Sequence, residues 1–118
     1  MTALAPRVRH VHARVGFTEG PQVPDPRGAW CARFTAGHMT WWAEIFEAAA
    51  AAGLDSISCT PEFGPAEYVP QTGGGEPVAN VWEINHHIGL QVQAAYRARF
   101  GEEHGRLVAD PEPAPEKV

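Results

Sequence analysis

The chain has 118 residues, 44% of them hydrophobic, including four Trp and five Phe. This length suits one small domain with a core built from large apolar side chains. The formal net charge is −5, with 14 acidic and 9 basic residues. Without an excess of basic residues, neither nucleic acid nor an anionic membrane is expected as a partner.

The cysteines and the N-terminal residues bear on the compartment. Cys31 and Cys59 fall in unrelated contexts and form no CxxC pair, which favours a reducing environment. The first 15 residues lack the apolar core of a secretory signal. No later stretch approaches the ~20 apolar residues of a membrane-spanning helix. These features predict a soluble, cytoplasmic protein.

The first structural unit covers residues 8–53. Residues 8–15, VRHVHARV, alternate polar and apolar side chains with period two and predict a strand. The Gly- and Pro-rich stretch 16–28 predicts a loop. Residues 29–52 carry apolar side chains at three-to-four-residue spacing and predict a helix, with Gly53 directly after its end.

The second unit repeats this order. LDSISCT, residues 54–60, predicts a strand, and a long loop separates it from a helix between about Asn80 and Phe100. Asn80 and Glu83 have the spacing of a capping box, and Gly101 marks the helix end. Residues 102–118 are Pro-rich and charged and predict a disordered tail, so residues 1–101 are expected to form the folded part.

The order strand, helix, strand, helix predicts an α/β fold with two parallel strands. Alternation places His10, His12 and Arg14 on one face of the first strand, and Glu62 continues the matching face of the second. Functional residues of α/β folds collect at the carboxyl ends of the strands, so His12, Arg14 and Glu62 are expected to lie together. The opposite faces are apolar and would meet the helices: Val11, Ala13, Val15, Ile57 and Cys59.

A carboxylate at the end of a strand is costly to bury unless it is paired or holds a metal. The residues leave several interpretations of Glu62 open: a metal ligand, a cap of the next turn, or a partner of Arg14. By spacing alone, His10 and His12 are more often hydrogen-bonded or solvent-facing imidazoles than metal ligands. Further loop residues are possible substrate contacts without an assigned role: Glu19, Gln22, Arg27, Phe63 and Tyr68.

Three stretches resemble the closing portion of the sugar phosphate isomerase/epimerase family, whose fold is the xylose isomerase-like TIM barrel. They are RHVHARVGFTEGPQVPDPR, TPEFGP and PVANVWEIN, and the resemblance covers about residues 7–100. It implies that the chain corresponds to the last two of eight βα units, so that the fold would be a fragment of a (β/α)8 barrel.

The resemblance also implies a site. Sugar epimerases of this superfamily hold one divalent metal with two glutamates, an aspartate and a histidine from different strands. The histidine, second of an HxH pair, and the last glutamate correspond to His12 and Glu62. Glu62 would also be catalytic, moving a proton next to a carbonyl, while the metal stabilises the enediolate. Beside this carry-over, the strand pattern itself places Arg14 on the same face as His12, where it could hold a substrate hydroxyl or phosphate, and His10 is a second substrate-binding candidate.

The resemblance leaves the metal open among Mn, Co, Mg and Zn. A small sugar or sugar phosphate is the implied substrate. The other metal ligands would lie on barrel strands outside these residues. The chain is therefore expected to be inactive alone and to assemble with the missing N-terminal barrel portion or with itself.

Two other function classes remain. A non-catalytic remnant or interaction module would keep the motifs without a metal. A metal-dependent endonuclease on the same barrel fold is disfavoured by the acidic net charge.

Overall fold

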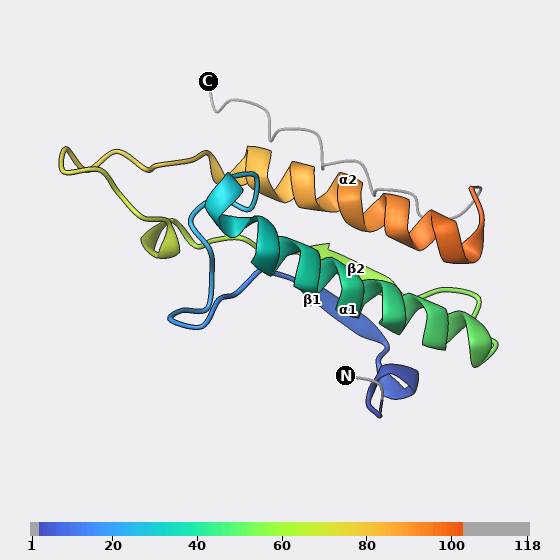
Figure 1. Ribbon diagram of the computed structural model, residues 1–118. Coiled ribbons are helices and arrows are strands. Elements are labelled where there is room, and N and C mark those ends of the chain that lie inside the picture. Colours follow the sequence, from blue (N-terminus) through green and yellow to red (C-terminus); the bar gives the residue numbers. More distant parts are fainter. Residues whose placement is uncertain (1–2, 103–118) are drawn as a thin grey trace, which may run out of the picture.

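The computed structural model describes residues 3–102, and residues 103–118 of the expected tail lie outside this range. The described residues form two strands and two long helices (Figure 1). They are β1 (His10–Ala13), α1 (Ala32–Ala51), β2 (Ser58–Pro61) and α2 (Val81–Phe100). Short 3-10 helices occur at Ala5–Arg7, Ala29–Cys31 and Ala66–Tyr68. This order confirms the predicted α/β class.

The two strands pair in parallel, with His10 opposite Ser58 and His12 opposite Thr60. Each strand has four residues and is shorter than the sequence predicted. Local hydrogen bonds explain the difference. The Arg14 N–H turns back to the carbonyl of His12 at 3.0 Å, which ends β1. The Ile57 N–H donates to the hydroxyl of Tyr96 at 3.1 Å, so its partner is a side chain of α2.

Helix α1 presents one apolar face to the sheet. Its buried side chains include Trp42, Ile45, Phe46 and Ala49, whose spacing gives a single stripe. The predicted start at residue 29 is a 3-10 turn, and the α-helix begins at Ala32. Gly53 follows the helix with φ of 76°, a left-handed conformation that glycine adopts without steric cost.

The N-terminus of α2 is capped as the sequence predicted. The side chain of Asn80 accepts hydrogen bonds from the N–H groups of Trp82 at 2.9 Å and Glu83 at 3.4 Å. The carboxylate of Glu83 accepts a hydrogen bond from Arg27 at 3.2 Å and so ties the long loop after β1 to α2. These contacts hold the N-terminal end of α2 in place.

The core lies between the helices and the apolar face of the sheet. The largest of the fully buried side chains there are Phe46, Ile84, Ile88, Val15 and Val23. The helices touch through Phe46 and Tyr96, whose ring centroids are 5.2 Å apart. Val11 and Ala13 are buried, whereas His10 and His12 are exposed. The helices therefore cover the apolar face alone, and the polar face is open.

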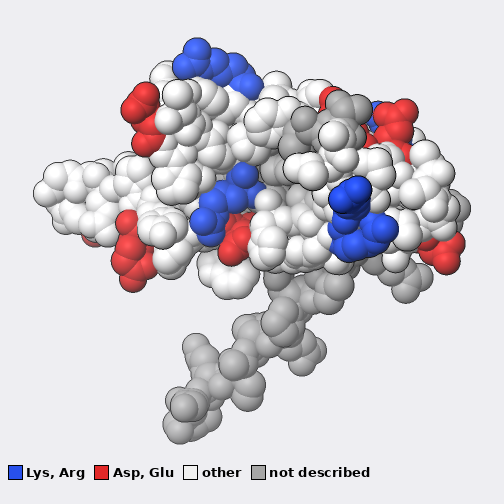
Figure 2. Space-filling view, turned by 90° about the horizontal axis from the view of Figure 1, so that it is seen from below, with Lys and Arg blue, Asp and Glu red and all other residues white. Residues whose placement is uncertain are grey.

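Figure 2 shows acidic and basic side chains scattered over the displayed face without a large region of one sign. In the described part of the chain, no helix is both long enough and apolar enough to cross a membrane.

Two adjacent tryptophans on α1 test this assignment of the core. Trp42 is 5% exposed and Trp41 is 44% exposed. Trp42→Ala should lower the free energy of unfolding by about 3 to 5 kcal/mol, because it leaves a large cavity. Trp41→Ala is the matched control and should cost much less. Urea denaturation followed by circular dichroism measures both, and equal losses would show that α1 is rotated from the orientation described.

Candidate functional site

The polar side chains at the carboxyl ends of β1 and β2 form one cluster of His12, Arg14 and Glu62. In the parallel pairing of the strands, His12 lies opposite Thr60. The Glu62 N–H then donates to the carbonyl of Ala13 at 3.4 Å, which extends the pairing by one residue. Glu62 thus lies beside the end of β1, on the face that the sequence predicted.

His12 and Glu62 are in direct contact. The Nδ1 atom of His12 hydrogen-bonds with Oε2 of Glu62, and their side chains are 64% and 47% exposed. Because an ionised carboxylate only accepts, Nδ1 is the donor of this hydrogen bond. The structure therefore joins a carboxylate and an imidazole in an arrangement suited to proton transfer or to holding a cation.

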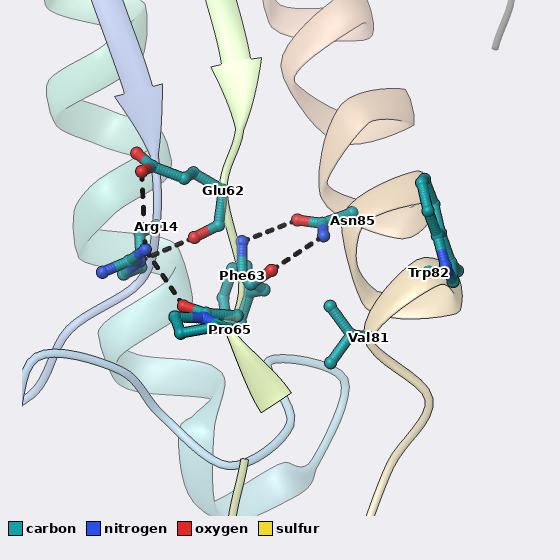
Figure 3. Close-up of a pocket in the computed structure, with 8 residues that line it drawn as sticks. Arg14, Glu62, Phe63, Pro65, Val81, Trp82 and Asn85 are labelled. Atoms are coloured by element: carbon teal, nitrogen blue, oxygen red, sulfur yellow. Dashed lines mark hydrogen bonds and ion pairs between the residues drawn. The ribbon is translucent and has the colours of Figure 1, made fainter. Parts of the chain in front are cut away.

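Arg14 binds the backbone that follows β2 (Figure 3). Its Nε donates to the carbonyl of Glu62 at 2.6 Å, and its Nη2 donates to the carbonyl of Gly64 at 3.1 Å. Nη2 also lies 3.6 Å from Oε1 of Glu62. The guanidinium carbon lies 5.7 Å from the ring centroid of Tyr68. Arg14 thus contacts both the main chain and the side chain of Glu62.

Two amide side chains complete the support of this segment. Asn85 on α2 accepts from the N–H of Phe63 at 2.7 Å and donates to the carbonyl of the same residue at 3.0 Å. Gln22, from the loop after β1, accepts from the N–H of Gly64 at 2.9 Å. Both side chains act as substitutes for a neighbouring strand.

The three N–H groups and three C=O groups of residues 62–64 are therefore all hydrogen-bonded, and side chains form five of these six bonds. The three side chains that supply them are Arg14, Gln22 and Asn85. Unpaired buried peptide groups are costly, so this set of bonds defines the path of the chain after β2. We call it the side-chain cage of residues 62–64.

His10 lies one step back along β1 and has a different partner. Its Nδ1 is 2.7 Å from the hydroxyl of Ser58 on β2. The rings of His10 and His12 meet edge to face with centroids 4.7 Å apart. His10 is thus beside the cluster without contacting Glu62.

The loop residues singled out in the sequence have different placements. Gln22 and Phe63 are buried and belong to the side-chain cage of residues 62–64. Tyr68 is exposed and lies beside Arg14. Glu19 is exposed in the turn closed by Phe17 and Gly20.

Arg27 makes ion pairs with Asp25 at 2.8 Å and Glu83 at 3.2 Å. The hydrogen bond from Arg27 lowers the pKa of the Asp25 carboxyl. Burial raises the pKa of Cys59 to about 12, which agrees with the inert thiol expected on the apolar face.

A hollow of about 470 Å³ adjoins the cluster (Figure 3). Its polar groups are those of Arg14, Glu62 and Asn85, and each already has a partner within the chain. Its apolar wall is formed by Phe63, Pro65, Val81 and Trp82. The volume is in the range of small-molecule sites.

The donor set is incomplete for a metal ion. Among residues 3–102, no group of three or more His, Cys, Asp or Glu side chains is placed to hold one. His12 and Glu62 are two suitable donors, and catalytic metal sites generally use three or more protein ligands. The described residues therefore bring two potential donors together and do not by themselves form a metal site.

Comparisons with known proteins give no further assignment. No family model, curated protein or solved structure matches the chain. The functional argument therefore depends on the geometry of the cluster and the residues around it.

Sequence reasoning missed Asn85. The available signal was its position on α2 between the buried Ile84 and the buried Ile88, where a polar side chain needs a partner. Its partners are the peptide groups of Phe63, which lie 22 residues away in sequence.

Asn85→Ala tests the cage. The substitution leaves both peptide groups of Phe63 without their partners and should lower the free energy of unfolding by about 1 to 3 kcal/mol. It should also accelerate hydrogen exchange at the Phe63 amide. His86→Ala, at the next and exposed position of α2, is the control and should change neither quantity. Unchanged exchange at Phe63 in Asn85→Ala would contradict the cage.

Proposed function

We propose that the chain is the last two βα units of a sugar phosphate isomerase/epimerase-type barrel and provides part of its divalent-metal site. The observation that supports this most directly is the contact of His12 with Glu62. It joins an imidazole and a carboxylate at the carboxyl ends of adjacent parallel strands, where α/β enzymes place their functional groups. The open polar face of the sheet would then line the barrel interior.

The chemistry follows from these side chains. Isomerisation of a hydroxy aldehyde or ketone requires removal of a proton next to a carbonyl, and the carboxylate of Glu62 is the base for this step. Once Nδ1 of His12 has given up its proton, His12 and Glu62 would hold a divalent cation in place of their hydrogen bond. The cation would supply positive charge for the developing enediolate. His10 would face the sugar substrate from the same sheet face. The remaining ligands would come from outside the chain.

An aromatic surface on α1 supports assembly with further barrel elements. Phe34, His38 and Trp41 recur at three-to-four-residue spacing and follow one flank of the helix, next to Trp30. Trp30 is 59% exposed. We call these four residues the aromatic stripe.

The aromatic stripe points away from α2. Phe46, which contacts α2, lies about 120° around α1 from Phe34. The rings of Trp30 and Phe34 instead contact Phe17, which follows β1. A preceding βα unit of a barrel would pack its helix on this flank and pair its strand with the edge of β1 that β2 leaves free.

Trp30 and Trp41, the two exposed members of the aromatic stripe, also favour a second candidate, a non-catalytic interaction module of the same fold. Such a module would use the stripe for docking and would not need His12 and Glu62 to bind a metal. Metal binding by these two residues separates the candidates.

The chain alone should bind Mn²⁺ weakly through His12 and Glu62, and water-proton relaxation enhancement measures this binding. His12→Ala and Glu62→Gln should each abolish the enhancement while the circular dichroism spectrum is retained. His86→Ala, which alters an exposed histidine of α2, should leave it unchanged. Enhancement that persists in both site variants would reject the metal site and favour the interaction module.

The aromatic stripe predicts self-association of the purified chain. Trp30→Ser and Trp41→Ser should each shift sedimentation velocity profiles toward the monomer, because each removes exposed apolar surface. Leu90→Ser, at an exposed position on α2, is the control and should not shift them.

The chain alone is expected not to isomerise sugar phosphates when manganese is added. A monomeric wild-type chain with this activity would overturn the proposed need for completion.

A further inference from the structure

Arg14 occupies the centre of the cluster, but its contacts are made within the chain. The Nε atom and the Nη2 atom each donate to a main-chain carbonyl, at 2.6 and 3.1 Å. The side chain is 24% exposed, and Tyr68 lies beside its guanidinium.

These contacts occupy the Nε–Nη2 edge of the guanidinium, one of the two edges that can bind an anion with paired N–H groups. Arginine binds carboxylates and phosphates with two parallel N–H groups in a planar fork. In this chain the fork formed by Nε and Nη2 binds the carbonyls of Glu62 and Gly64. A substrate phosphate would have to displace both hydrogen bonds to use the same edge. The geometry thus disfavours the substrate contact that the sequence suggested for Arg14.

We propose that Arg14 is a positioning residue for Glu62 rather than a substrate ligand. It ties the chain on both sides of Phe63 to the end of β1, and its Nη2 lies 3.6 Å from the Glu62 carboxylate. Together these contacts hold the carboxylate against Nδ1 of His12. The inference goes beyond the proposed function because it requires neither a substrate nor a metal.

Lysine cannot reproduce this arrangement, although it keeps the positive charge. Its ammonium is a point charge at the end of a flexible chain and cannot span two carbonyls in the fixed geometry of a fork. Arg14→Lys therefore separates charge from positioning, while Arg14→Met removes both.

The tautomer of His12 provides the readout. At about pH 9 a free imidazole is neutral and carries its proton mainly on Nε2, whereas the contact with Glu62 places the proton on Nδ1. ¹⁵N NMR of the ring nitrogens distinguishes the two forms. The wild type should show the Nδ1–H form, and Arg14→Lys and Arg14→Met should both lose it. Arg9→Met is the control and should keep it, because Arg9 donates to the nearby carbonyls of Pro6 and Val8.

Amide exchange supplies a second readout in the same samples. Exchange at Phe63 and Gly64 should become about tenfold faster in both Arg14 variants, because the segment that presents these N–H groups to Asn85 and Gln22 loses its two hydrogen bonds from Arg14. Retention of the Nδ1–H form in Arg14→Lys would overturn the positioning role, because charge alone would then suffice.

A third measurement uses the wild-type chain and does not depend on the folding of a variant. Inorganic phosphate is titrated while the Nε–H resonance of Arg14 is followed. We expect no saturable shift, because this N–H remains bonded to the carbonyl of Glu62. A saturable shift would assign Arg14 to anion binding and overturn the proposal. None of these outcomes depends on isomerase activity.

Discussion

The structure depends on how the peptide groups after β2 are satisfied. Residues 62–64 leave the sheet, yet their N–H and C=O groups still need partners. Arg14, Gln22 and Asn85 provide these partners from the end of β1, the following loop and α2. One short segment is therefore fixed by both βα units at once. The position of Glu62 is a consequence of this cage, because its carboxylate extends from a main chain that three elements hold.

The division of the sheet into two faces explains why the cluster is accessible. Alternation along β1 sends Val11 and Ala13 into the core and His12 to the opposite side. The helices pack on the apolar side, where burial of Phe46 and Ile84 stabilises the fold. The ionisable side chains are thus kept out of the core, where an unpaired charge would be costly. The face of the two strands that packs in the core is therefore opposite to the face that carries the ionisable side chains.

The sequence predicted the features that depend on local signals. The period-two alternation placed His12 and Glu62 on one face, and the Asn80 cap located the start of α2. It did not predict the cage, because Gln22 and Asn85 bind peptide groups 42 and 22 residues away in sequence. The sequence also predicted strands that are too long, because no local sequence signal indicates that the Ile57 N–H donates to Tyr96. Side chains that replace backbone partners follow no sequence period.

The reach of Asn85 across the fold sets an order in which the site can form during synthesis. Glu62 leaves the ribosome before α2, at a stage when the peptide groups of Phe63 have no partner from Asn85. At that stage β1 and β2 are both available for pairing, but the segment of residues 62–64, which positions Glu62, lacks its hydrogen bonds with Asn85. The bonds that support residue 63 are therefore complete only once α2 has docked. A truncation just before α2 would leave both histidines of β1 in place beside a carboxylate with no defined position.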